Sequence, residues 1–93
     1  MAKNDPDAAW ANYITEVGLR LNQFRTAAGL SQEKVANQVG ITRNHYQLLE
    51  KGKSSPTAVA NPQLRTIAAL AEVLGVGIGD IMPDKPRGIT TGA

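Results

Sequence analysis

The apolar residues of this 93-residue chain recur at helical spacing in several separate segments. The first stripe consists of Trp10, Ile14, Val17, Leu21, Phe24 and Ala28. Intervals of three or four residues place these side chains on one face of a helix. Asp5 can cap the start of that helix, Pro6 is tolerated in its first turn, and Gly29 can end it. The pattern predicts a long helix over residues 6–28.

A second apolar pattern predicts a short helix over residues 31–39 that ends in a sharp turn. The Ser31 hydroxyl can cap an unpaired amide of the first turn. Gly40 interrupts the pattern at a point where only a residue without a Cβ turns at low cost. The inward face would be formed by Val35, Ala36 and Val39. Because Ala36 is small, a second helix can cross the first closely at this position.

The next helix is predicted over residues 42–51. Thr42 can cap it, Tyr46 and Leu49 face inward, and Gly52 is placed to follow its last turn. Ile41 would fill the turn between the two helices. The residues from 31 to 53 therefore read as two short helices joined by a tight turn.

The rest of the chain predicts two more helices, over residues 62–74 and 78–82. Asn61 and Pro62 repeat the pattern of a cap followed by proline. The inner face of the fourth helix is predicted as Leu64, Ile67, Ala68, Ala71 and Leu74, with Leu70 beside it. With no alternating strand pattern, the fold class is predicted as all-α, a compact five-helix bundle with an extended first helix. Residues 1–5 are predicted as a disordered N-terminus and residues 84–93 as a flexible tail.

The motif over about residues 31–52 resembles the helix-turn-helix of phage Cro/repressor-type (Xre-like) DNA-binding domains. The resemblance rests on Gln32, Ala36, Gly40, Ile41, Leu49 and the run Glu50, Lys51 and Gly52. It extends from about Val17 to Pro83. Because the predicted first helix continues back to residue 6, residues 6–83 are predicted as one domain. It implies that the helix starting at Thr42 is a recognition helix that enters the major groove. It also implies a structural ion pair between Arg25 and Glu50.

The chain departs from the pattern of that family at two places. Tyr46 stands where the family usually has a smaller branched aliphatic residue, and its hydroxyl needs a partner if it is buried. About six additional residues, TAVANP, follow Pro56. The sequence leaves open the path of residues 54–62.

Charge is more informative locally than overall. The net charge is only +2. Between Thr42 and Arg65, however, four basic residues stand against one acid, which gives a local charge of 4 − 1 = +3. The four are Arg43, Lys51, Lys53 and Arg65, and the acid is Glu50. Because this excess coincides with the expected recognition helix, it favours a nucleic-acid surface.

The side chains of the expected recognition helix suggest two kinds of DNA contact. The residues predicted to read bases are Arg43, Asn44, Gln47 and Leu48, since their donors, acceptors or methyl groups match base edges in the major groove. The residues predicted to hold phosphates are Ser31, Gln32, Thr42, His45, Lys51, Lys53 and Ser54. These two groups should affect specificity and affinity differently.

Composition argues against several other classes of protein. The chain has no Cys, one His, no Gly-rich phosphate loop and no paired carboxylates, so we expect no enzyme activity, no metal site and no cofactor. No run of apolar residues is long enough for a membrane span, and the first ten residues lack an apolar signal core, so a cytoplasmic protein is expected.

The sequence favours a transcriptional regulator, a repressor, that binds double-stranded DNA at a two-fold operator as a homodimer. Two alternatives stay open: the antitoxin of a toxin–antitoxin pair, with a toxin as protein partner, and a protein-binding helical adaptor without DNA binding. Trp10, Tyr13 and Ile14 lie before the region of resemblance. They would either fold back on the C-terminal helices or form a dimer surface.

Overall fold

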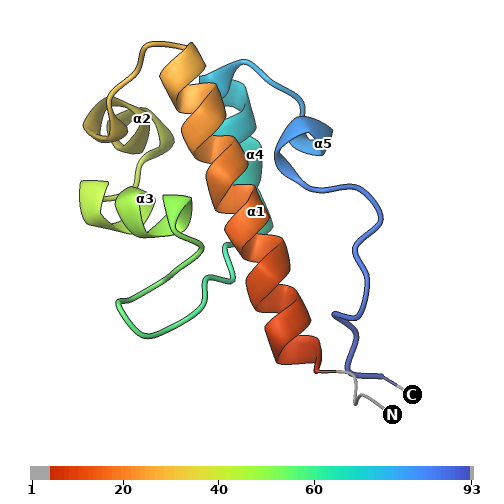
Figure 1. Cartoon of the computed structure of the whole chain (residues 1–93). Coiled ribbons are helices and arrows are strands. Elements are labelled where there is room, and N and C mark those ends of the chain that lie inside the picture. Colours follow the sequence, from red (N-terminus) through yellow and green to blue (C-terminus); the bar gives the residue numbers. More distant parts are fainter. Residues whose placement is uncertain (1–4, 93) are drawn as a thin grey trace.

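The computed structural model describes residues 5–92 of the chain, and this part contains five helices (Figure 1). They are α1 (Pro6–Ala27), α2 (Gln32–Val39), α3 (Arg43–Glu50), α4 (Leu64–Leu74) and α5 (Ile78–Ile81). Residues 5–92 contain no β-strand, although one isolated antiparallel bridge pairs Lys53 with Val59. The prediction of an all-α five-helix fold is confirmed, and the predicted boundaries differ from the observed ones by at most two residues.

Helix α1 runs through the length of the molecule. Its 22 residues span about 33 Å. The Asp5 carboxylate caps it by accepting hydrogen bonds from the amides of Asp7 and Ala8, both at 3.1 Å. Figure 1 shows α2 and α3 on one side of α1, α5 and the C-terminal segment on the other, and α4 behind. Helix α1 thus contacts both the helix-turn-helix and the C-terminal part of the chain.

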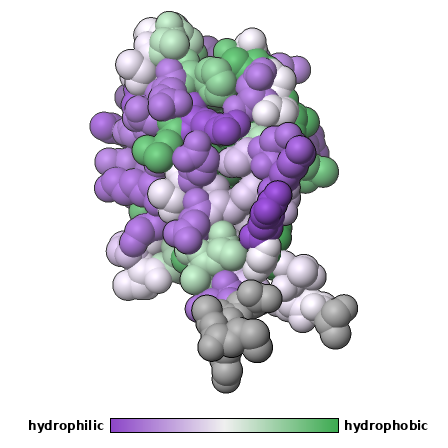
Figure 2. Space-filling model, turned by 45° about the vertical axis from the view of Figure 1, so that its right-hand side comes forward, coloured by the Kyte–Doolittle hydropathy of each residue, from purple (hydrophilic) through white to green (hydrophobic). Residues whose placement is uncertain are grey.

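The hydrophobic core collects side chains from all five helices and from one loop residue, Ala60. Its members are Ile14, Val17, Leu21, Val35, Ala36, Tyr46, Leu49, Ala60, Ile67, Leu70, Ala71, Leu74 and Ile81. On the face shown in Figure 2, hydrophilic residues cover most of the surface and hydrophobic residues form separate groups. The large hydrophobic residues that are exposed come from four different segments: Leu19, Val59, Leu64 and Ile78.

The predicted inner face of the fourth helix was partly wrong. Helix α4 begins at Leu64, two residues after Pro62, and Leu64 is 75% exposed. Leu70 is completely buried, whereas Ala68 is exposed. The chain stays extended up to Gln63 because Ala60 is fixed in the core and the connection must reach from there to the start of α4.

The segment between α3 and α4, whose path the sequence left open, folds into a small hairpin loop, residues 53–59. The bridge between Lys53 and Val59 closes it, and the amide of Ser54 donates to the carbonyl of Ala58 at 3.0 Å. The Ser55 hydroxyl accepts from the amides of Thr57 and Ala58 at the tip. The additional residues therefore form an ordered turn.

The two ends of the described chain lie beside each other. A Cβ placed on Gly88 would be 3.4 Å from the Cβ of Ala9, so residues 84–92, which form no helix or strand, run along the start of α1. The flexibility expected of residues 84–93 stays a prediction. Of residues 1–5, predicted as a disordered N-terminus, Asp5 is the N-cap of α1. Residues 1–4 lie outside the described residues, as does residue 93.

Candidate nucleic-acid interface

The turn between α2 and α3 is built from local signals. The Ser31 hydroxyl accepts from the amide of Lys34 at 3.1 Å, and the Thr42 hydroxyl accepts from the amide of His45 at 3.0 Å. Gly40 adopts a φ of 91°, in the left-handed region that favours glycine. Ala36 is completely buried, as expected for the point where α2 and α3 approach each other. These features set the angle at which α3 leaves the turn.

Helix α3 has one buried and one exposed face. Tyr46 and Leu49 are buried, while Arg43, Asn44 and Gln47 are exposed. At about 100° per residue, these three exposed side chains and that of Lys51 fall within an arc of about 100°. Three of the four residues predicted to read bases therefore share one accessible side of α3. The fourth, Leu48, is half-buried at the edge of this arc.

The residues predicted to hold phosphates divide into two sets. Ser31, Thr42, Lys51, Lys53 and Ser54 are exposed, and His45 is half-buried. The Ser31 and Thr42 hydroxyls accept helix amides but keep a proton to donate. Within residues 5–92, the Lys53 ammonium donates to a neutral partner, the carbonyl of Pro56 at 3.3 Å, and forms no ion pair.

Gln32 has a different role from the one predicted for its side chain. Its Nε2 donates to Oε1 of Glu50 at 3.0 Å in a half-buried site. That interaction ties the start of α2 to the end of α3. The side-chain amide of Gln32 is therefore used within the protein, and its predicted contact with phosphate is replaced by a contact with Glu50.

Glu50 is the centre of a polar network that joins three helices. Arg25 of α1 donates Nε to Oε2 at 2.6 Å and Nη2 to Oε1 at 3.3 Å. Asn22 of α1 donates to Oε1 at 3.0 Å. The side chain of Glu50 is only 5% exposed and that of Arg25 is 17% exposed. The structure thus contains the ion pair that the resemblance implied, in a partly buried, two-pronged geometry.

The network determines the ionisation of its members. Burial raises the pKa of the Glu50 carboxyl, but hydrogen bonds from Arg25 and its other neighbours outweigh burial and bring the pKa to about 2. The same bond raises the pKa of Arg25. Burial also raises the pKa of Tyr46. Among residues 5–92, the buried hydroxyl of Tyr46 makes no hydrogen bond of good geometry.

Two residues of α1 that position α3 were not found from the sequence. A Cβ on Gly18 would lie 2.5 Å from the carbonyl oxygen of Glu50 and 2.7 Å from that of Leu49, so only glycine lets α1 pack against the end of α3. A lone glycine within a helical pattern was the available signal. Asn22 carried no such signal, because its role depends on where Glu50 lies in space.

The residues predicted as a dimer surface fold back on their own chain. Ile14 is 2% exposed, so its assignment to a dimer contact is wrong: the side chain belongs to the core. Trp10 and Tyr13 are half-buried and stack on each other with ring centres 5.5 Å apart. Their polar atoms are also used within the chain, by Ala60 and Pro83. The aromatic pair is therefore bonded to the segment before α4 through Trp10 and to the C-terminal segment through Tyr13.

This arrangement defines a class of protein. Two short helices meet across a tight turn, the first supports the second, and the second presents exposed amide and guanidinium groups along one side. These are the features of a helix-turn-helix domain.

Comparison with known proteins identifies the family. The helix-turn-helix domain family matches residues 16–81, and the chain belongs to this family. It is 34% identical over 70 residues to the cryptic phage CTXphi transcriptional repressor RstR of Vibrio cholerae, covering 75% of this chain and 58% of that protein. It is 42% identical over 59 residues to the SPbeta prophage-derived uncharacterized HTH-type transcriptional regulator YonR of Bacillus subtilis, covering 63% of this chain and 49% of that protein.

A solved structure agrees with this assignment. The crystal structure of the restriction-modification controller protein C.AhdI from Aeromonas hydrophila is similar, with a TM-score of 0.65 and 32% sequence identity over 74% of this chain and 96% of that chain. The chain spans about half the length of RstR and YonR. In residues 5–92, no helix is long and apolar enough to cross a membrane. The first ten residues of α1 and the segment after Ile81 lie outside the family match.

Proposed function

We propose that this chain binds double-stranded DNA in a sequence-specific manner and represses transcription, with α3 in the major groove. The observation that carries the proposal is the set Arg43, Asn44 and Gln47, which share one exposed side of a helix held from behind by the Glu50 network. Relatives named as a phage repressor and transcriptional regulators support the same activity. The proposal also takes the protein to be cytoplasmic and without enzyme activity.

The side-chain chemistry of each exposed residue of α3 suggests the base that it would contact. Arg43 can donate two hydrogen bonds to O6 and N7 of guanine, and the amides of Asn44 and Gln47 can pair with N6 and N7 of adenine. Leu48 is half-buried, so it can contact a thymine methyl only at the edge of the interface. Lys51, Lys53 and Ser54 follow α3 in the chain, and we assign them, together with His45 at the flank, to contacts with backbone phosphates.

The proposed assembly is a homodimer on a two-fold operator. One recognition helix reads only a few base pairs, and two half-sites about 10 base pairs apart, or a multiple of this, would supply the remaining specificity. Because Ile14 is buried, the dimer contact should involve a different surface. The antitoxin alternative would place a toxin either on the surface of Trp10, Tyr13 and Ile14 or on the C-terminal tail. The burial of Ile14 and the partial burial of Trp10 and Tyr13 weaken the first of these two docking sites.

The first experiment is selection of bound sequences from random double-stranded DNA, followed by titration of the preferred and a scrambled sequence across a salt series. Asn44→Ala and Arg43→Ala should each cost about 1–3 kcal/mol on the preferred sequence and relax preference at one base pair. Lys53→Ala should weaken both sequences equally and flatten the salt dependence by about one charge.

Lys85→Ala is the matched control. It removes the same charge from the C-terminal segment, which lies on the opposite side of α1 from α3 (Figure 1), and should leave both affinities unchanged. If Arg43→Ala and Asn44→Ala both preserve the ratio of preferred to scrambled affinity, α3 does not read the sequence. Absence of binding to any DNA at low salt would favour a protein-binding adaptor.

A further inference from the structure

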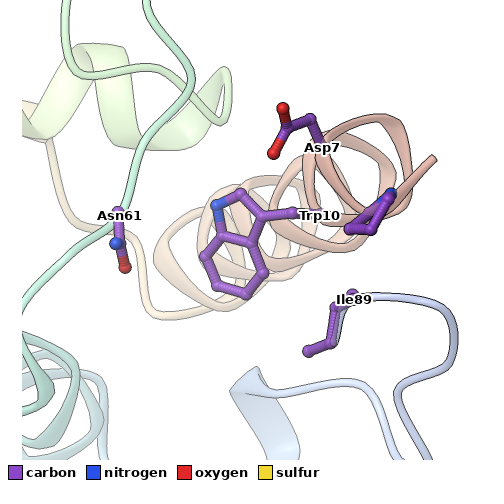
Figure 3. A pocket seen from close by; sticks show the side chains of 5 residues that line it. Asp7, Trp10, Asn61 and Ile89 are labelled. Atoms are coloured by element: carbon purple, nitrogen blue, oxygen red, sulfur yellow. The ribbon is translucent and has the colours of Figure 1, made fainter. Parts of the chain in front are cut away.

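The hairpin loop, residues 53–59, is held at its base by a contact from Trp10, in the N-terminal part of α1. Ala60, which directly follows the loop, is 1% exposed. Its amide donates to the carbonyl of Gly52 at 2.9 Å, and its carbonyl accepts from Nε1 of Trp10 at 2.8 Å. Figure 3 shows the indole nitrogen on the side of the ring that faces the segment leading to Asn61. Both backbone polar groups of Ala60 are therefore used to hold the base of the loop.

Trp10 is itself braced from the opposite side. Its ring stacks on Tyr13, whose hydroxyl donates to the carbonyl of Pro83 at 3.0 Å. Ile89 of the C-terminal segment lies near the ring (Figure 3). All these contacts come from segments outside the part of the chain that matches the family, residues 16–81, except for Ala60 itself. The flanking segments thus support the additional loop.

The loop has the surface chemistry of a phosphate-contacting element. It leaves α3 directly and lies on the same side of α1 as α2 and α3 (Figure 1). Lys53, Ser54 and Thr57 are exposed, and the sequence has no acidic residue between Lys51 and Ala71. A basic side chain, hydroxyls and the absence of carboxylates suit a phosphodiester backbone.

We propose that Trp10 is a positioning residue: its bond to Ala60 holds the hairpin loop, residues 53–59, where the loop lies along the phosphate backbone beside α3. This inference rests on the proposed function, which assigns Lys53 and Ser54 of the loop to phosphates, and adds the residue that keeps the loop in place. A free loop would lose conformational freedom when it settled on the duplex, so a loop ordered in advance binds more tightly. If the contact-ready population falls, the apparent affinity falls by the same factor.

The test compares two conservative variants of the aromatic pair on the selected DNA. Trp10→Phe keeps an aromatic ring but removes the donor to Ala60, and should weaken binding about five- to tenfold, the equivalent of one net hydrogen bond. Tyr13→Phe removes the bond to Pro83 and should leave the affinity unchanged. Hydrogen exchange at the amides of Ser54 and Ala60 should become faster in Trp10→Phe and not in Tyr13→Phe. A general loss of stability would instead speed exchange throughout the domain.

A loop variant tests the contact without depending on Trp10. Replacement of residues 54–58 by two glycines retains Lys53 and Val59, and should weaken preferred and scrambled DNA equally, by about tenfold, because neutral backbone contacts carry no sequence information. In this background, Trp10→Phe should have no further effect on the affinity.

Two results would overturn the inference. One is a loop variant that binds DNA as tightly as the natural chain. The other is an equal loss of affinity from Trp10→Phe with and without the loop. Either result leaves the proposed function intact as long as Arg43→Ala still impairs binding, so failure of this inference can be distinguished from failure of the proposed function.

Discussion

The replacement Glu50→Gln tests how far the position of α3 depends on one buried charge. Gln has nearly the shape of Glu, so the change removes charge with little loss of volume. The replacement would point an NH₂ group toward the donors of Arg25, Asn22 or Gln32, which all approach the Glu50 carboxylate. Arg25, whose side chain is only 17% exposed, would keep its charge without a counterion.

The pKa of Glu50 provides the expected magnitude. It falls from an ordinary value of 4.5 to about 2 in the folded protein. Each pKa unit corresponds to about 1.4 kcal/mol, so the charged form of Glu50 contributes roughly 3 kcal/mol at neutral pH. Because the folded-state pKa is depressed, this contribution is fully present above pH 4.5 and is lost as the pH falls toward 2. Glu50→Gln should therefore be most destabilising at pH 7, and the difference should close over that range.

The assay is urea unfolding followed by circular dichroism, with the natural chain and Glu50→Gln compared at a series of pH values. Glu16→Gln is the matched control, since Glu16 forms an ion pair with Arg20 at 3.4 Å in an exposed site. Exposed pairs contribute about 0–1 kcal/mol. A double-mutant cycle with Arg25→Ala should give a large coupling energy. Equal effects of Glu50→Gln and Glu16→Gln, a difference independent of pH, or negligible coupling would refute the reasoning.

Three further predictions concern packing. Gly18→Ala should destabilise the domain by about 1–3 kcal/mol and weaken DNA binding, because the new Cβ would collide with the end of α3. Gly79→Ala, whose Cβ would have no neighbouring atom within 4 Å, should change neither property. Thermal unfolding and DNA titration of both variants check this. Leu70→Ala should cost about 2–5 kcal/mol and Leu64→Gln about 0.5 kcal/mol or less, and a larger loss from Leu64→Gln in urea unfolding would contradict the observed face of α4. Tyr46→Phe should be nearly neutral in the same assay, since the buried hydroxyl makes no good hydrogen bond, and a loss above about 1.5 kcal/mol would show that the hydroxyl is paired.

The parts of the fold that could be predicted from the sequence are those with local causes. Ser31, Gly40 and Thr42 determine helix ends through bonds to residues three or four positions away, so the sequence alone locates the turn. The start of α4 was misplaced because Asn61 and Pro62 carry a local signal that a tertiary constraint overrides. Ala60 is fixed in the core and bonded to Gly52, and the chain needs extended residues to reach α4 from there.

In the candidate site too, the features with local causes could be predicted from the sequence and those that depend on tertiary contacts could not. The exposed side of α3 follows from periodicity, which correctly separated Arg43, Asn44 and Gln47 from Tyr46 and Leu49. The Arg25–Glu50 pair came from the resemblance. The parts played by Asn22 and Gln32 could not be found, since they depend on how three helices meet in space.

The aromatic residues at the start of α1 link these observations. Periodicity placed Trp10 and Ile14 on one stripe but could not say what covers it, because a stripe identifies a buried face and not its partner. In the structure the same helix packs Gly18, Asn22 and Arg25 against the end of α3, and uses Trp10 to hold the loop that follows. The orientation of both proposed DNA-contacting elements therefore depends on α1. We infer that replacements along α1 that never touch DNA should alter DNA binding, with those near Gly18 acting through α3 and those near Trp10 acting through the hairpin loop.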